Sequence, residues 1–235
     1  MEMFILFLPI FIAVHVYQFY TTYKKYQIIN GTPTTEIQNI DTGYFEIKGQ
    51  VSSKSEMLLS PMDQIECVWY CLIIKELVKS GKKHTYSTKA NIQKFTKCML
   101  DDGTGTCELD LTHVKFNLNK EHYSQSGILE SPTKRQLEML DKAGLKSTTI
   151  VGINKNFQYL EYVLRVGDEL YVLGDCVAGI SSSDTVTCRG TSQKPIFISD
   201  KSEEYLLETH KSEMTKSGVT IFLASIIFAV LILQF

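Results

Sequence analysis

The sequence lacks any excess of basic residues. Its 24 lysines and arginines are balanced by 26 aspartates and glutamates, and the formal net charge at pH 7 is −2. Domains that bind nucleic acid usually carry a clear basic surplus, because their affinity comes largely from contacts between cations and phosphates. The charge balance therefore argues against nucleic acid as a partner.

The sequence also lacks the motifs that announce a metal, a cofactor or a catalytic site. Its six cysteines never occur with the Cys-x-x-Cys spacing that is typical of zinc sites. A Cys–His nucleophile rests on residue type alone, since His84, His113 and His122 are ordinary histidines by their sequence context. Gly103 and Gly105 lack the strand–turn–helix context of a nucleotide site. We therefore expect no metal, no cofactor and no catalytic residue.

Charge is absent from two apolar stretches, residues 3–20 and residues 218–235. A helix of either length is about 27 Å long, close to the hydrocarbon thickness of a bilayer. The second stretch, GVTIFLASIIFAVLILQF, has no polar face of the kind that a buried core helix normally shows. The pattern predicts one transmembrane helix at each end of the chain.

A cleaved signal peptide is the alternative for the first stretch. It would need a basic beginning and a small-x-small cleavage site, and the sequence offers Glu2 and no such site. Aromatic residues and then Lys24 and Lys25 follow instead, which favours an uncleaved anchor. Because Lys211 and Lys216 flank the other stretch on the same side, the positive-inside rule predicts a two-pass membrane protein with a cytoplasmic domain.

Between these anchors, the pattern predicts a mainly β domain of the α+β class over residues 21–199. Alternating or continuous apolar runs bounded by turn residues predict strands; these are residues 43–52, 66–77, 92–100, 106–111, 157–164 and 169–177. Ser131 and Pro132 predict the start of a helix that ends near Gly144. A second helix begins near Asp200, and its juxtamembrane part covers residues 200–217.

The turn at Asp102-Gly103 determines how two cysteines are expected to meet. If these two residues form the tip of a hairpin, Cys98 lies directly opposite Cys107, at a position where cross-strand side chains approach closely. The two form a possible cross-strand thiol pair. Cys176 and Cys188 flank another turn-rich segment, residues 179–184. A cytoplasmic domain predicts free thiols, and an oxidising compartment would allow disulfides.

Four stretches in order resemble the GIDE domain, also called the "beside a membrane" domain, of mitochondrial-type membrane ubiquitin ligases. They are GQVSSKSEMLLSP at 49–61 followed by Cys67-Val68-Trp69-Tyr70, FTKCMLDDGTGTCEL at 95–109, YLEYVLRVGDELYVLG at 159–174 and PIFISDKSEEYLL at 195–207. The resemblance covers about residues 44–217. It implies a β-rich domain held against a membrane, which precedes a cytosolic RING in the eukaryotic ligases. This sequence has no RING pattern, and in that respect it is similar to stand-alone prokaryotic members.

Two functional hypotheses follow. The first is a non-enzymatic binding or scaffold module, whose partners are the lipid bilayer and a protein in the membrane. The strand around residues 95–109 and the turn Val166-Gly167-Asp168 resemble pieces of an OB-like barrel, a binding architecture, and this analogy favours the first hypothesis. The second is a ubiquitin-transferase-like role in which a partner supplies the RING. A thiol or metal-dependent hydrolase ranks third.

Overall fold

The computed structural model describes residues 2–53, 55–81, 83–178 and 185–233. The chain divides into two compact units, one containing the two terminal helices and the other containing Thr35–Asp200. Each unit is considered by itself.

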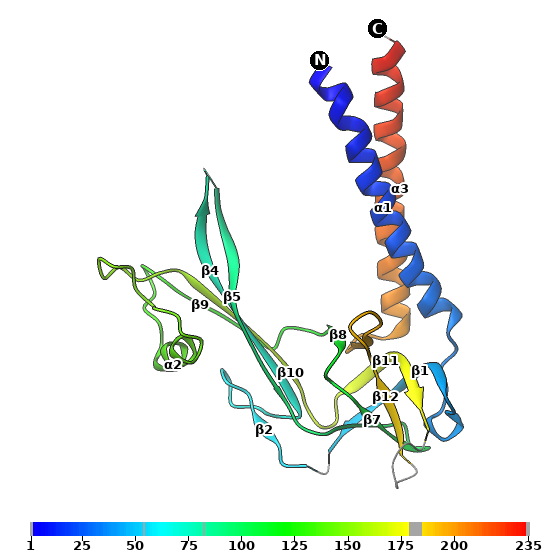
Figure 1. Ribbon diagram of the computed structural model, residues 1–235, viewed down its shortest axis with the longest axis vertical. Helices are drawn as coiled ribbons and strands as arrows, with labels where there is room; N and C mark the ends of the chain where they lie inside the picture. Colours follow the sequence, from blue (N-terminus) through cyan, green and yellow to red (C-terminus); the bar gives the residue numbers. More distant parts are fainter. Residues whose placement is uncertain (1, 54, 82, 179–184, 234–235) are drawn as a thin grey trace. The chain divides into compact units, whose positions relative to one another are not determined.

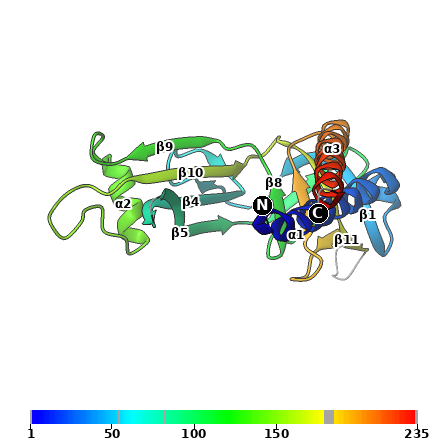
Figure 2. The same ribbon diagram turned by 90° about the horizontal axis from the view of Figure 1, so that it is seen from above.

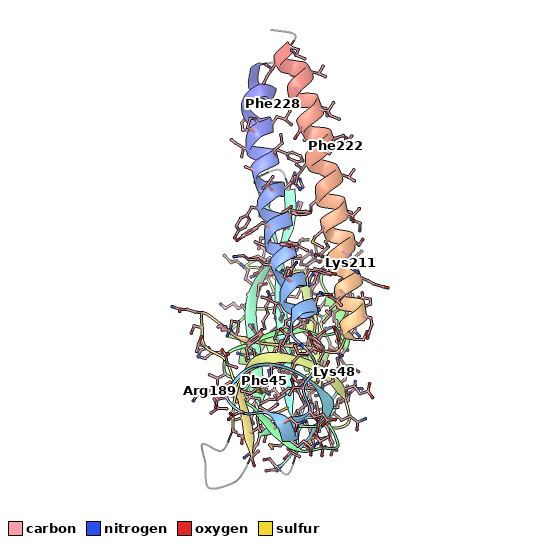
Figure 3. All side chains as sticks on the ribbon, turned by 90° about the vertical axis from the view of Figure 1, so that its right-hand side faces the viewer. Phe45, Lys48, Arg189, Lys211, Phe222 and Phe228 are labelled. Carbon is pink, nitrogen blue, oxygen red and sulfur yellow. A yellow bond between two sulfur atoms is a disulfide. The ribbon has the colours of Figure 1, made fainter. Side chains whose placement is uncertain are left out.

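The first unit consists of two long helices, α1 (Glu2–Gly31) and α3 (Glu203–Leu233), which lie side by side with both chain termini at the same end (Figure 1). Phe222 and Phe228 lie along the C-terminal half of α3, and Lys211 lies nearer its beginning (Figure 3). Within the described residues, α3 is the one helix that is long and apolar enough to cross a membrane. The N-terminal span stays a prediction, and α1 continues well past residue 20.

Five strands of the second unit close into a barrel. They are β1 (Gly43–Ser52), β6 (Cys98–Asp101), β7 (Thr106–Leu109), β12 (Val186–Arg189) and β11 (Glu169–Val177). Neighbours pair in this order and β11 returns to pair with β1, so the ring is complete. Only the pair β7–β12 is parallel among them. The five-stranded closed ring is the architecture of an OB-like barrel, and β13 (Ile196–Ser199) and β8 (Val114–Asn117) extend it beside β11.

Strand alternation explains the barrel interior. On β1, Ile47 and Val51 are buried, and on β7, Cys107 and Leu109 are buried while the side chains between them face outward. Successive strand residues point to opposite faces, so a period of two puts every second side chain into the core. The barrel core is therefore aliphatic and sulfur-rich.

The second β-layer is a four-stranded antiparallel sheet with the order β5-β4-β10-β9. Its strands are β4 (Trp69–Ser80), β5 (Lys83–Phe95), β9 (His122–Ser126) and β10 (Phe157–Leu164), and Figure 2 shows them side by side with α2 (Lys134–Lys142) across one end. Two short elements precede them: η1 (Ile37–Asn39), and the pair β2 (Leu58–Leu59) and β3 (Glu66–Cys67). The helix packs on the sheet through one apolar cluster that contains Met139, Leu140, Leu72, Ile74 and Tyr159.

Most of the predicted elements are confirmed. The strands at 43–52, 157–164 and 169–177 match β1, β10 and β11, and the run at 66–77 becomes β3 and β4. As predicted for a central strand, β4 is covered on both faces, because Cys71 belongs to the barrel-side cluster and Leu72 to the cluster under α2.

Two predicted boundaries are wrong. The run at 92–100 is not one strand, since its beginning belongs to β5 and its end to β6, in different sheets. The helix α2 begins later than predicted, because its N-cap is Thr133 and not Ser131. Thr133 and Gln136 form a reciprocal capping box. The predicted helix end at Gly144 is confirmed by the positive φ of that residue, and the predicted helix start near Asp200 is confirmed by α3, which begins at Glu203.

Candidate functional site

The predicted direct pairing of Cys98 with Cys107 is wrong. Asp101 pairs with Thr106, so Cys98 lies opposite Leu109 and Cys107 lies opposite Leu100. The turn is wider than the two residues assumed, because the Asp102 carboxylate accepts hydrogen bonds from the backbone N–H groups of Thr104 and Gly105. Cys98 and Cys107 are therefore diagonal neighbours, and both are free thiols.

Cys176 and Cys188 do face each other, at directly paired positions of β11 and β12, and they form a disulfide. The expectation of free thiols is wrong for these two residues, and the turn-rich segment 179–184 between them lies outside the described residues. The Sγ of Cys107 is 3.3 Å from the Sγ of Cys188. Three sulfurs on three neighbouring strands thus meet inside the barrel.

The free thiols of the domain are buried and unreactive. Burial raises the pKa of the Cys98 and Cys107 thiols to about 12. Because the thiolate is the nucleophile, a thiol with so high a pKa is almost unreactive at neutral pH. Cys67 and Cys71 are likewise buried, and burial raises the pKa of each to about 11. The four free cysteines therefore act as core residues.

The histidines differ sharply in their surroundings. His84 and His113 are exposed. His122, on the edge strand β9, lies between two partners: its Nδ1 is 2.8 Å from Oδ1 of Asp63, and its Nε2 is 2.9 Å from Oγ of Ser124. His122 and Ser124 are two residues apart on one strand and therefore point to the same face of the sheet.

A buried carboxylate holds Asp63 in place. Glu161, on β10 directly opposite His122, is fully buried. It accepts hydrogen bonds from the Ser60 hydroxyl at 2.8 Å, from the Met62 N–H at 2.7 Å and from the Asp63 N–H at 3.3 Å. Buried charges are stable only when such donors satisfy them. These three hydrogen bonds to Glu161 therefore hold the loop that carries Asp63 in place.

The helix α2 holds Ser124, the second partner of His122. The Gln136 side chain is buried, and its amide Nε2 donates to the Ser124 hydroxyl at 3.0 Å. Its Oε1 accepts the backbone N–H of Thr133, which completes the capping box. Arg135 also donates to the Pro61 carbonyl at 3.0 Å, so α2 is tied to the loop that precedes Asp63.

The direction of each hydrogen bond follows from the partners. A carboxylate only accepts, so Nδ1 of a neutral His122 carries the proton toward Asp63 and Nε2 is left as the acceptor. The Ser124 hydroxyl therefore donates to Nε2 and accepts from the Gln136 amide. The result is one continuous chain, Asp63–His122–Ser124–Gln136, assembled from a loop, an edge strand and a helix.

Sequence reasoning missed this chain. His122 was considered only as a partner for a cysteine, and Asp63 and Ser124 were not considered. The one local signal is the pair His122 and Ser124 with strand spacing; Asp63 comes close only through the fold.

A second feature is a patch of exposed aliphatic side chains on two loops that flank α2. We call it the aliphatic tip; it comprises Ile128, Leu129, Ile150, Val151 and Ile153, which are all exposed, Leu129 and Ile150 completely. The loops are joined, because the Ile128 N–H donates to the Asn156 side chain and Asn154 donates to Ser131. A joined apolar patch on a surface typically marks an interaction site.

The comparison with protein families decides the relationship. The profile of the GIDE family, described as E3 Ubiquitin ligase, matches residues 79–233, more than half of the chain. The chain belongs to the GIDE family. No curated protein and no solved structure matches it significantly.

Membership of the GIDE family agrees with the resemblance seen in the sequence. The matched region contains His122, Ser124, Glu161, the aliphatic tip and the apolar helix α3. This GIDE-family protein is therefore associated with a membrane. Within its described residues, no group of three or more metal-ligating side chains is arranged to hold an ion.

Proposed function

We propose that this GIDE-family protein is a membrane-anchored binding module whose β domain docks a protein of the same membrane. The observation that carries the proposal is the aliphatic tip. Its two loops, which carry the exposed apolar side chains, are tied to each other by hydrogen bonds that involve side chains. Each aliphatic side chain buried by a partner would contribute about 2 kcal/mol.

The partner is a protein and not nucleic acid. The outward-facing residues of β6 and β7, the strands that carry the binding face in OB-like barrels, include Asp101 and Glu108. These carboxylates repel phosphate, and the charge balance of the whole chain supports the same conclusion.

Photocrosslinking tests the docking surface. A photoreactive amino acid at Ile153 of the full-length protein, in its native membrane, is expected to give a discrete protein adduct. The double substitution Ile150→Asp and Val151→Asp should reduce this adduct at least tenfold, whereas the same probe at exposed Lys83, on β5, should give none. Adducts with lipid only, or equal adducts at residues 153 and 83, would contradict the proposal.

The family description favours a second candidate, a ubiquitin-transferase-like role in which a partner supplies the RING. A RING needs paired Cys/His ligand sets, so this chain would contribute substrate docking and not transfer. Autoubiquitination by the purified protein with a conjugating enzyme alone would instead establish it as a transferase.

We further propose that α1 is a second membrane span and that the β domain is cytoplasmic. The four lysines that flank the apolar stretches on the domain side support this orientation. Cytosolic reductants keep thiols reduced, so the disulfide between Cys176 and Cys188 is the observation that argues against this orientation, and non-reducing mass spectrometry of rapidly quenched cells tests it. A Cys176–Cys188 disulfide in unstressed cells would place the domain in an oxidising compartment.

A further inference from the structure

We propose that Asp63, His122 and Ser124 form a catalytic relay that hydrolyses activated carboxylic esters. This inference goes beyond the binding role and does not depend on it. It rests on two distances, 2.8 Å from Asp63 to His122 and 2.9 Å from His122 to Ser124, which fall in the range required for a base and its nucleophile. A Ser–His–Asp relay is recognised by geometry and roles, not by sequence order.

The proton positions are those that the chemistry needs. Asp63 accepts from Nδ1–H of His122 and so fixes the tautomer in which Nε2 is a free base. In this tautomer the Ser124 hydroxyl, whose oxygen is 2.9 Å from Nε2, is the donor to that base. No rearrangement is needed before proton transfer, because the resting hydrogen bonds already have the required direction.

The relay is built into the domain and is not a chance meeting of surface side chains. Glu161 holds the backbone of Asp63 and the preceding residues from a fully buried position, and Gln136 holds the Ser124 hydroxyl from the buried side of α2. Both act as positioning residues. The reacting groups themselves reach solvent: His122 and Ser124 are half-buried, and the Asp63 side chain is 37% exposed.

The surroundings select the substrate class. The Gln136 amide donates to Ser124 Oγ at 3.0 Å and to the Gln125 carbonyl oxygen at 3.4 Å, so it holds the nucleophile and is not a free donor for an oxyanion. Among the described residues, no side-chain donor other than Gln136 and His122 contacts Ser124 Oγ. Without a preformed oxyanion site, the relay is restricted to esters with good leaving groups, such as aryl esters and thioesters. The carboxylates of Asp63 and Glu161 disfavour anionic acyl groups.

The reaction balances with water as the only co-reactant. Ser124 Oγ attacks the ester carbonyl carbon while its proton passes to Nε2 of His122. The bond from the carbonyl carbon to the alcohol or thiol then breaks, and the leaving group departs with that proton. A water molecule attacks the acyl-serine, gives its proton to Nε2, and the acid leaves as the proton returns to Ser124.

A fluorophosphonate probe tests the relay on the full-length protein in detergent micelles. We expect covalent labelling, with the probe mass on the peptide that contains Ser124, and turnover of p-nitrophenyl acetate. Ser124→Ala should abolish both. The matched control is Ser126→Ala, on the same strand and face, where the hydroxyl contacts Tyr159; it should keep the label.

The histidine variant separates chemistry from structure. His122→Ala should slow labelling by about 100-fold, and added imidazole should restore part of the rate, which a purely structural role would not produce. Absence of label on the folded wild-type protein, or equal labelling of wild type and Ser124→Ala, would overturn the proposal.

Discussion

Glu161 shows what a single buried charge does in this domain. Its carboxylate collects three donors from residues about a hundred positions earlier, Ser60, Met62 and Asp63. The sequence predicted only that Glu161 lies in a strand, because the period-two pattern locates a residue on an element but not its distant partners. The side chain that organises the relay was thus invisible before the fold was known.

Replacing Glu161 by Gln should destabilise the domain by about 3 kcal/mol, because an amide can accept from only part of this donor set and turns its own N–H groups toward the remaining donors. Thermal unfolding of the purified full-length protein measures the change. Glu138→Gln, on the exposed face of α2, is the matched control and should change stability little. Equal effects of the two substitutions would refute the role assigned to Glu161.

Asp102 makes stability depend on pH. Burial raises its pKa, but hydrogen bonds from Ile37, Thr104 and Gly105 stabilise the charged form and lower the pKa below its usual value. A lowered pKa in the folded state means a contribution that is present above the unfolded value, about 4, and is lost as pH falls below it. The wild type should therefore lose more stability than Asp102→Asn between about pH 5 and about pH 2. Parallel stability curves from chemical denaturation at each pH would contradict this.

At the scale of elements, the bounds of three strands were predicted correctly, whereas the pairing across a turn was not. β1, β10 and β11 have the predicted bounds, because their apolar runs are long and bounded by turn residues. The predicted register of β6 and β7 was wrong because it assumed a two-residue turn. Hydrogen bonds to the Asp102 side chain form a wider turn, so Cys98 pairs with Leu109. The adjacency of β10 and β11 in sequence likewise hid that they belong to different sheets.

Gly190 shows how closely two elements approach beyond β12. A Cβ atom there would lie 2.6 Å from the backbone N of Ile196 and would collide with the carbonyl oxygen of His113, the two atoms that hydrogen-bond to each other at 3.0 Å. Gly190→Ala should therefore cost roughly 2–4 kcal/mol of unfolding free energy, because backbone must move to admit the methyl group. Gly31→Ala, which meets open space, is the control. An unchanged melting temperature of the Gly190→Ala variant would contradict this prediction and show that the contact is loose.

At the scale of the whole molecule, the pattern of apolar, charged and turn residues along the sequence predicted an anchored β domain. The C-terminal apolar helix and the five-stranded barrel agree with that prediction, and the family match supplies the membrane association. The sequence pattern could not predict which distant segments come together. The relay joins a loop, an edge strand and a helix, and the aliphatic tip joins two loops. Each is produced by contacts between residues far apart in the chain.

The most direct test of the central claim, a two-pass membrane protein with its β domain on one side, is protease protection in sealed vesicles. An epitope tag is fused to each terminus of the full-length protein, and protease is added to vesicles with the cytoplasmic face outward. The account predicts that the β domain is digested while the peptides bearing both tags are protected and remain in the membrane after alkaline carbonate extraction. Loss of the N-terminal tag together with the β domain would show that α1 does not cross the membrane, and would contradict the account.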